Sequence, residues 1–381
     1  MLALSTRTYV PRTSLVGRLK TGPIEQLVMP SECESALANE NTKSVSFDDK
    51  ISFLSAPEHY HEHAKQVTLL QTHHAWLFMT ERHVFKMKKP SRQGGYDFSS
   101  LESRHWLCQE ELRLNRRLAR DTYLAVVPLI RNRNGGLELD GDGCPVEWLV
   151  KMARLPDSRM LLTVASQGLA ASADIRSLMR KLYRFHESAP TFQFRAGGYV
   201  ARLHQKIETW TEELLRPPFA LPAARVIELS ELLYAYVEAF AGLLEQRQRD
   251  GHIREGHGDL RPEHVFLVEN AEPEIIDCLE FDINLRRLDS AEEIAFLAME
   301  CRHAGQSRLA RACYNCYRSE YGRAAVPGHL WDFYAALGAM ARAGVSAWRI
   351  PDPTAGERSK RKAIDYLNDA RHHIALAQAD R

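Results

Sequence analysis

The chain has almost no net charge, because 50 Lys and Arg residues nearly balance 49 Asp and Glu residues in a total of 381, giving a formal charge of +1. Such a balance gives no electrostatic reason to expect a nucleic acid or a membrane surface as a partner. The sequence also has no apolar run near the roughly 18 residues that a membrane span requires. Its seven cysteines, an odd number, occur without a secretory signal. We therefore expect reduced thiols and a cytoplasmic protein.

Two glycine motifs that bind phosphate are also missing. The sequence contains no Gly-x-x-x-x-Gly-Lys-Ser/Thr, so a P-loop domain is not expected. The short loop at 72–75, which joins the first two expected strands, contains no glycine either. Backbone contacts to phosphate at this loop are therefore in doubt, unless a tighter turn supplies them.

The most informative segment that the sequence does contain is His257–His264, which reads His-Gly-Asp-Leu-Arg-Pro-Glu-His. An apolar run, a polar turn and a second apolar run follow it and end at Asp277, a pattern that predicts a β-hairpin. Because a hairpin returns the chain to where it started, we expect Asp259 and Asp277 to face one another. Two carboxylates held together need a proton or a cation between them. A magnesium ion with a phosphate-bearing substrate is the natural occupant.

This layout resembles the kinase-like core of the aminoglycoside phosphotransferase family, which also includes choline kinases and related small-molecule kinases. The resemblance implies that Asp259 is the catalytic base and that Asp277 holds Mg²⁺ on the phosphates of ATP. The family has Asn at the position of His264. Histidine nitrogen suits zinc, copper or iron better than magnesium. His264 therefore remains a candidate metal ligand, with the alternatives that one metal site is lost or that Asp277 and water hold the metal alone.

Other residues in and after the motif are candidates for the same site. Arg261 lies inside the expected catalytic loop and could stabilise charge on the transferring group. A salt bridge from Arg261 to Glu263 or Glu280 is the alternative. His257, which opens the motif, is a further candidate catalytic residue. Glu280 and Asp282 follow the metal-binding position and could bind a cationic or hydroxylated substrate.

Upstream of the motif, strands are expected at 67–71, 76–79, 84–88 and 146–152. The resemblance implies that one strand carries a lysine that binds the α- and β-phosphates. We favour Lys86, with Lys88 as the alternative, since residues two apart share a face of a strand. The alternative is that these lysines lie on a solvated edge strand, where lysines discourage aggregation. Met152, at the end of the last strand, is expected near the hinge that contacts adenine.

A helix is expected from the possible cap at Ser99 and Ser100 to about Ala119, with Trp106 among its apolar positions. The family places a glutamate on this helix that pairs with the strand lysine. Glu111 is the favoured candidate, and a surface glutamate supporting neighbouring arginines is the alternative.

Several phrases look like a bacterial branch of uncharacterised aminoglycoside-phosphotransferase-like proteins. They are Val84–Pro90, Asp97–Glu102 and Glu110–Leu118, and the resemblance covers roughly residues 50 to 350. Some members carry a second, P-loop kinase domain, which the missing P-loop motif argues against here. The resemblance does not determine the substrate class.

From Asp174 onward the apolar periodicity is mostly helical, with a long pattern from Arg225 to Arg249. Asp289 is a plausible helix N-cap, and either Asp289 or Glu293 is expected to brace the catalytic loop. The predicted class is α+β, a protein-kinase-like two-lobed fold with a small β-rich N-lobe and a mostly helical C-lobe. Its expected parts are a disordered tail at 1–45, which we prefer to an organellar presequence, an N-lobe with one helix at 46–152, and a C-lobe at 153–381.

The main hypothesis is ATP-dependent phosphorylation of a hydroxyl group on a small molecule, with ATP and Mg²⁺ as cofactors. A non-catalytic pseudokinase, which binds nucleotide or nothing and acts through partners, is the competing hypothesis. His264 and the missing glycine loop motivate it. A transition-metal hydrolase using His257, Asp259, His264 and Asp277 is a third. The phosphate acceptor, the choice between ATP and GTP, and the oligomeric state stay open.

Overall fold

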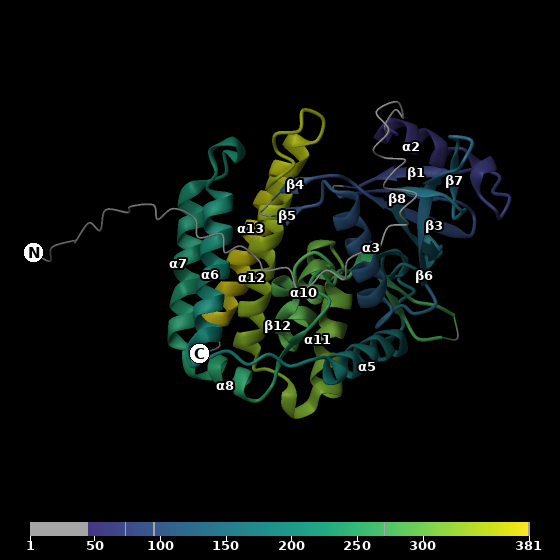
Figure 1. Ribbon diagram of the computed structural model, residues 1–381. Coiled ribbons are helices and arrows are strands. Elements are labelled where there is room, and N and C mark those ends of the chain that lie inside the picture. Colours follow the sequence, from purple (N-terminus) through teal and green to yellow (C-terminus); the bar gives the residue numbers. More distant parts are fainter. Residues whose placement is uncertain (1–44, 73, 94–95, 270, 380–381) are drawn as a thin grey trace, which may run out of the picture. The chain divides into compact units, whose positions relative to one another are not determined.

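The computed structural model describes residues 45–72, 74–93, 96–269 and 271–379 (Figure 1). The tail predicted at 1–45 lies outside the described residues except for its last position. The chain divides into two compact units. Of the described residues, the first unit contains those at 45–81, 85–108 and 127–149, and the second contains those at 82–84, 109–126 and 150–379.

A six-stranded sheet, in the order β1-β2-β3-β8-β6-β7, forms most of the β structure. Strands β1 and β2 pair antiparallel, with Thr68 opposite Met79. The four strands expected from the sequence are confirmed, whereas β6 and β7 were not anticipated. The strands of this sheet are β1 Thr68–Gln71, β2 Ala75–Met79, β3 His83–Lys88, β6 Tyr123–Arg131, β7 Leu137–Leu139 and β8 Cys144–Ala153, and a separate pair is β4 Arg92–Gln93 with β5 Tyr96–Asp97.

Helix α3 (Leu101–Asn115) begins at the expected cap, where the Ser103 N–H donates to the Ser100 hydroxyl at 3.1 Å. It ends at Asn115 and continues only as turns, so the predicted end at Ala119 was wrong. Trp106, expected among the apolar positions, is 46% exposed. The buried face runs through positions 107, 108, 111, 114 and 115, and Trp106 lies off this face because a helix turns about 100° per residue.

A buried ion network ties helix α2 (Phe47–Ser55) to the sheet within the first unit. Glu147 on β8 is fully buried, with Lys50 at 2.9 Å and Arg104 at 2.8 Å. The pair of Lys50 with Glu147 joins α2 to β8, and Arg104 adds a second cation to the buried carboxylate.

The second unit is mostly helical, and its core includes residues from all of its longer helices. Helices α6, α7, α12 and α13 lie beside one another, with contacts α6·α7, α12·α13, α6·α12 and α7·α13 (Figure 1). The single pattern predicted from Arg225 to Arg249 is two helices, because Phe240 leaves the helical region at φ −115° and ψ 20°. The helices are α4 Leu161–Ser166, α5 Ser172–Ser188, α6 Gly198–Leu214, α7 Ala223–Ala239, α8 Ala241–Arg249, α9 Ile283–Arg286, α10 Ser290–His303, α11 Ser307–Tyr321, α12 Gly328–Ala347 and α13 Gly356–Ala379.

Helix α10 is buried on nearly every side although it carries Glu292, Glu293 and Glu300. Asp289 caps its first turn by accepting from the Ala291 N–H at 2.8 Å, which confirms the predicted N-cap. Each of these three buried glutamates therefore requires a specific polar partner.

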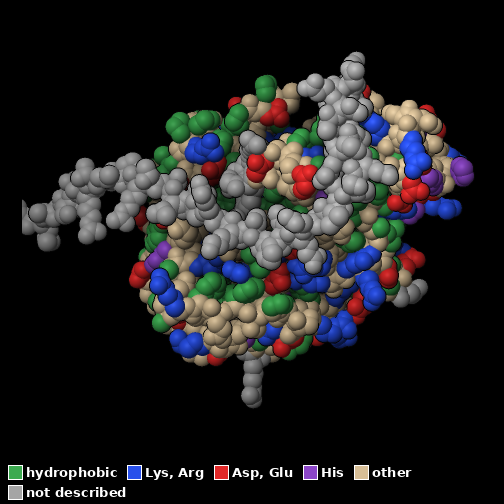
Figure 2. Space-filling model, viewed as in Figure 1, with side chains coloured by type: hydrophobic (Ala, Val, Ile, Leu, Met, Phe, Trp, Pro, Cys, Tyr) green, Lys and Arg blue, Asp and Glu red, His purple; other side chains and the backbone are tan. Residues whose placement is uncertain are grey.

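The surface carries charges of both signs. Acidic and basic side chains both occur on the face drawn in Figure 2, in agreement with the balanced composition. No helix among the described residues is long and apolar enough to cross a membrane.

Candidate active site

The predicted hairpin is present but shorter than expected. Strand β10 (Val265–Phe266) pairs antiparallel with β11 (Glu274–Ile275), Val265 opposite Ile275. The segment before it contains strand β9 (Ile253–Glu255) and a 3₁₀ turn at Pro262–His264. The hairpin therefore connects the His257–His264 segment, the predicted catalytic loop, to the segment that contains Asp277.

Backbone hydrogen bonds hold these two segments together. The Ile276 N–H donates to the His264 carbonyl at 2.9 Å, and the Leu279 N–H donates to the His257 carbonyl at 3.1 Å. The His257 ring contacts the Ile276 carbonyl through Nε2 at 2.9 Å. The relative position of the two carboxylate-bearing segments is thus fixed at several points.

His264 lies against both aspartates. Its Nε2 is 3.5 Å from Asp277 Oδ2, and its Nδ1 is 3.9 Å from Asp259 Oδ2. Nδ1 also donates to the Asp259 carbonyl at 2.8 Å. The expectation that Asp259 and Asp277 lie near one another agrees with this geometry, in which one imidazole contacts both carboxylates.

Arg261 also enters this group. Its Nε is 3.1 Å from Asp259 Oδ2, its Nη1 is 3.3 Å from Glu263 Oε1, and its Nη2 donates to His264 Nε2 at 2.7 Å. The guanidinium therefore uses the lone pair of Nε2, and the ring proton resides on Nδ1. In this arrangement His264 offers no electron pair to a metal, and the Glu263 salt bridge considered from the sequence is present.

Asp277 has a backbone conformation that few non-glycine residues adopt, with φ +65°. Its N–H donates to the Tyr123 hydroxyl at 3.1 Å, and the N–H of Cys278 donates to Asn115 Oδ1 at 2.9 Å. A left-handed non-glycine residue costs about 1–3 kcal/mol and is often found at functional sites. Sequence reasoning missed both Tyr123 and Asn115, because nothing local marks a partner more than 150 residues away.

Glu293 braces the start of the catalytic loop. Its Oε1 accepts from the N–H groups of His257 and Gly258, each at 2.7 Å, and its Oε2 is 2.8 Å from His186 Nε2. Burial acts to raise the pKa of Glu293, but the hydrogen bond and charge of His186 hold it below its usual value. Of the two braces considered from the sequence, Glu293 contacts the loop, whereas Asp289 forms a bidentate pair with Arg247 at 2.5 and 2.7 Å.

His257 is fully buried, and backbone groups occupy both of its ring nitrogens. Nε2 donates to the Ile276 carbonyl, and Nδ1 accepts from the Asp259 N–H at 3.3 Å. Burial lowers the pKa of His257, which keeps the ring neutral. We therefore assign His257, a candidate catalytic residue from the sequence, to positioning Asp259, and this use of its nitrogens argues against the transition-metal hydrolase alternative.

Gly258 has to be glycine in this loop. Its φ is +87°, and a Cβ there would lie 3.2 Å from both Arg286 Cγ and Leu279 Cδ1. The backbone angle strains any side chain at this position, and an added Cβ would also require its close neighbours to shift. The His-Gly-Asp motif therefore has a structural reason for its middle residue.

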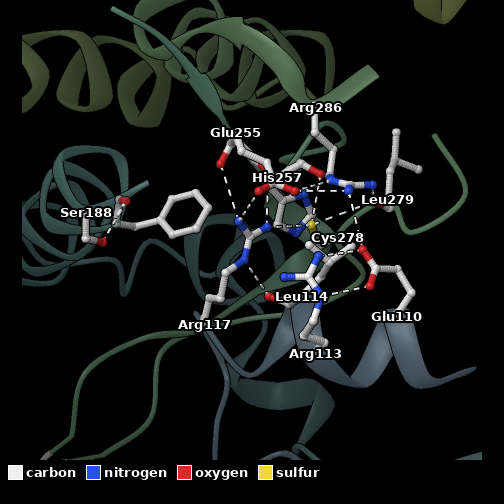
Figure 3. A network of polar contacts seen from close by, with 12 residues as sticks. Glu110, Arg113, Leu114, Arg117, Ser188, Glu255, His257, Cys278, Leu279 and Arg286 are labelled. Atoms are coloured by element: carbon white, nitrogen blue, oxygen red, sulfur yellow. Dashed lines mark hydrogen bonds and ion pairs between the residues drawn. The ribbon is translucent and has the colours of Figure 1, made fainter. Parts of the chain in front are cut away.

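A network of arginines and glutamates surrounds the segment after Asp277 (Figure 3). The nearly fully buried Arg286 contacts Glu255 at 3.0 Å and donates to the Leu279 carbonyl at 2.7 Å. Arg117, at the end of the turn after α3, contacts Glu255 at 3.7 Å and Cys278 Sγ at 3.5 Å. The charges tie β9, α9 and the Asp277 segment to one another.

Cys278 follows Asp277 and has no exposed surface. Its thiol donates to the His257 carbonyl at 3.2 Å. Burial raises the pKa of Cys278 to about 12, although Arg117 and Arg286 oppose this. The sulfur is therefore a protonated packing group in the folded chain.

The residues expected to bind nucleotide differ in burial. Lys88 is 3% exposed and Lys86 is half-buried, so the alternative lysine is the more deeply buried of the two. Glu111 on α3 is fully buried, and Met152 at the end of β8 is 7% exposed. Asp282, considered as a substrate ligand, caps α9 by accepting from the Asn284 N–H at 2.7 Å.

No group of three or more His, Cys, Asp or Glu side chains poised to bind a metal occurs among the described residues. Magnesium at phosphate-transfer sites is commonly bound by one or two carboxylates, with water and substrate phosphates completing its shell. Asp277, whose side chain is 42% exposed, fits such a site. His264 fits poorly, because it offers nitrogen and that nitrogen accepts from Arg261.

Comparison with known proteins gives relatives of most of the sequence. The sequence matches no protein-family model. Uncharacterized proteins from Mycobacterium tuberculosis and Mycobacterium bovis are 31% identical over 321 residues, which is 81% of this chain and 61% of theirs. The chain thus spans about three fifths of the length of these curated relatives.

Solved structures with a similar course of the chain include small-molecule kinases. A choline/ethanolamine kinase family protein from Mesorhizobium loti has a TM-score of 0.48 at 13% identity, covering 87% of this chain and 99% of that one. An aminoglycoside phosphotransferase from Streptomyces rimosus has a TM-score of 0.46 at 16% identity, covering 77% and 98%.

The predicted α+β class, with a small β-rich part and a larger helical part, is confirmed by the described helices and strands. With TM-scores below 0.5, the similarity leaves the activity and the substrate open.

Proposed function

We propose that this chain is an ATP-dependent phosphotransferase that acts on a hydroxyl group of a small molecule. The observation that carries the proposal is the contact of one imidazole, His264, with both Asp259 and Asp277. Two carboxylates placed together by backbone hydrogen bonds, one of them on a strained residue, form the kind of site that phosphoryl transfer uses.

In the proposed reaction Asp259 orients the acceptor hydroxyl and takes its proton. The hydroxyl oxygen forms a bond to the γ-phosphorus, and the bond from that phosphorus to the ADP oxygen breaks. Asp277 would hold Mg²⁺, which when bound would neutralise phosphate charge. Arg261, now 3.1 Å from Asp259, would turn to the transferring group and release the base.

The nucleotide would contact residues of both sequence halves. Lys88 or Lys86 would pair with the α- and β-phosphates, with Glu111 as the partner of the lysine. Met152 would lie at the adenine.

The first test is calorimetric titration of ATP into the protein with and without Mg²⁺. Binding in the micromolar to millimolar range that requires Mg²⁺ and is lost in Asp277→Ala would support the site. Asp259→Asn should keep ATP binding and lose turnover by about a hundredfold or more. Asp48→Asn, at an exposed position in the first turn of α2, is the matched control. Full activity of Asp259→Asn would reject the catalytic role.

A second candidate is a nucleotide-binding protein without catalysis, which the Arg261 contacts favour. The Arg261 guanidinium neutralises the charge of Asp259. It also donates to Nε2 of His264, the residue that stands where the family has an asparagine amide oxygen. His264→Asn separates the candidates. A kinase adapted to histidine should lose activity in this variant, whereas a site disabled by histidine should gain it.

A further inference from the structure

A cavity lies between helices α7 and α13, which contact one another within the helical unit. It has a volume of about 280 Å³ and is lined by Arg225, Leu367, Asn368 and Arg371. Arg225 belongs to the first turn of α7, and the other three belong to α13. None of these four residues belongs to the candidate active site, so the cavity is a separate feature of the fold.

The lining of the cavity combines an apolar residue with polar ones. Leu367 is 4% exposed and belongs to the hydrophobic core, whereas Arg225, Asn368 and Arg371 are exposed. Sites for small molecules commonly combine apolar lining with a few polar groups, and their volumes run from about 300 to 1,000 Å³. A cavity near the lower end of this range suits a small metabolite with one polar end.

Arg225 and Asn368 bring hydrogen-bonding groups that the fold itself does not use. Among the described residues, neither the Arg225 guanidinium nor the Asn368 amide has an ion-pair or hydrogen-bond partner. The first turn of α7 also contains no acidic residue that could balance Arg225. Because a guanidinium does not lose its proton in a protein, this positive charge is permanent.

Arg371 is held only by a weak ion pair. Its guanidinium contacts Glu228 of α7, and the two side chains are 58% and 46% exposed. An exposed ion pair contributes little to stability, because solvent screens it and both side chains lose freedom. Arg371 can therefore exchange Glu228 for the anionic group of a ligand at small cost.

The charges around the cavity leave an excess of positive charge. Two guanidiniums line it, and Glu228 balances one of them. The acidic residues on this stretch of α13, Asp365 and Asp369, are not among the lining residues. Asp369 is instead held by His303, with Nδ1 at 2.7 Å from Oδ2. The excess of positive charge favours an anionic ligand over a cationic one.

We propose that the cavity between α7 and α13 binds a small organic anion. Its carboxylate or phosphate group contacts Arg225 and Arg371, and its apolar part lies against Leu367. A guanidinium binds either anion in a bidentate manner, and the amide of Asn368 donates one further hydrogen bond. This binding is independent of the proposed phosphotransferase function and involves no covalent step.

The test compares ligands that share one ring and differ in the charge of the attached group. Phenyl phosphate, benzoate and benzyl alcohol are titrated by calorimetry into the full chain, with and without ATP and Mg²⁺. We expect at least one of the two anions to bind with a Kd about tenfold or more below that of benzyl alcohol, whether or not ATP is present. The tighter of the two anions distinguishes a phosphate from a carboxylate site.

Variants connect the binding to the cavity. Arg225→Gln and Arg371→Gln should each raise the Kd of the preferred anion about tenfold, because each removes a charge-assisted hydrogen bond. Glu228→Gln should lower this Kd, since it removes the carboxylate that competes for Arg371. Arg308→Gln, exposed on α11, is the matched control and should leave the Kd unchanged.

Asn368→Asp leaves both arginines in place and should weaken anion binding by adding a negative charge to the lining. Thermal unfolding of each variant separates a folding defect from a binding defect. Equal affinity for the three ring compounds, no measurable binding of either anion, or a Kd unchanged in both arginine variants would overturn the proposal. These outcomes leave the phosphotransferase proposal standing, because its test measures ATP binding and its dependence on Asp277.

Discussion

The backbone N–H of Asp277 donates to the hydroxyl of Tyr123 at 3.1 Å, which links residues 154 positions apart in the sequence. Tyr123 is 1% exposed, so this hydroxyl lies in the interior of the chain. The bond therefore helps to hold the left-handed conformation that aims the Asp277 carboxylate.

Tyr123→Phe should release this conformation without removing the carboxylate. We expect a loss of about 1–3 kcal/mol in the free energy of unfolding, because a buried N–H is left without its acceptor. Mg²⁺-dependent ATP binding should weaken as well. Chemical denaturation and calorimetry measure the two effects. Tyr314→Phe, the same change on α11, is the control, and equal effects of both substitutions would contradict the role of Tyr123.

Gly258→Ala should destabilise the chain and lower activity together. The φ of +87° disfavours any side chain, and the added Cβ would have to displace Arg286 or Leu279. A cost of about 1–3 kcal/mol is expected from these causes. Gly242→Ala, in α8 with open space at its Cβ, should instead be neutral or stabilising by about 0.5–1 kcal/mol. Thermal or urea unfolding of the two variants compares them directly.

Glu293→Gln should flatten the dependence of stability on acid pH. The pKa of Glu293 is lowered in the folded chain: burial opposes this shift, and His186 and the loop amides outweigh it. A carboxyl with a depressed folded pKa stabilises the fold above its unfolded pKa of about 4.3, and the stabilisation is lost as pH falls through the folded pKa. Urea unfolding from neutral pH to below about pH 4 should therefore show a smaller fall in the variant than in the parent chain. Glu231→Gln, at an exposed position on α7, should keep the parental slope.

Arg286→Met should be among the most destabilising substitutions in the second unit. It removes the main partner of the buried Glu255 and two hydrogen bonds to the carbonyls of Leu279 and Glu280. Breaking one side of a buried ion pair costs about 3–5 kcal/mol. Adding Glu255→Gln should recover part of that loss. A double-mutant cycle that shows simple additivity would argue that the two residues act independently.

The parts of the fold that the sequence predicted are those with local signals. The hairpin follows from two apolar runs around a polar turn, and the capped start of α3 from Ser100. The break at Phe240 was missed because apolar periodicity continues through it. Trp106 was wrongly predicted to lie on the buried face, because its apolar type was given more weight than its angular position around the helix.

The sequence predicted the pair of aspartates in the candidate site but not the residues that surround and hold them. Asp259 and Asp277 lie 18 positions apart across a hairpin, and a short connection fixes their proximity. The groups that hold them, Tyr123, Asn115 and His186, come from distant elements and have ordinary local contexts. The sequence suggests candidate roles for Arg261. Only the geometry shows that Arg261 contacts Asp259, Glu263 and His264 at the same time.

The buried thiol beside Asp277 makes the loop observable by chemical modification. Cys278 is fully buried, and burial raises its pKa to about 12, so the reactive thiolate is scarce while the segment is closed. A thiol reagent will modify it chiefly when the catalytic-loop segment separates from the hairpin. The rate of that modification can be followed by mass spectrometry with and without ATP. This rate reports how often this part of the molecule opens.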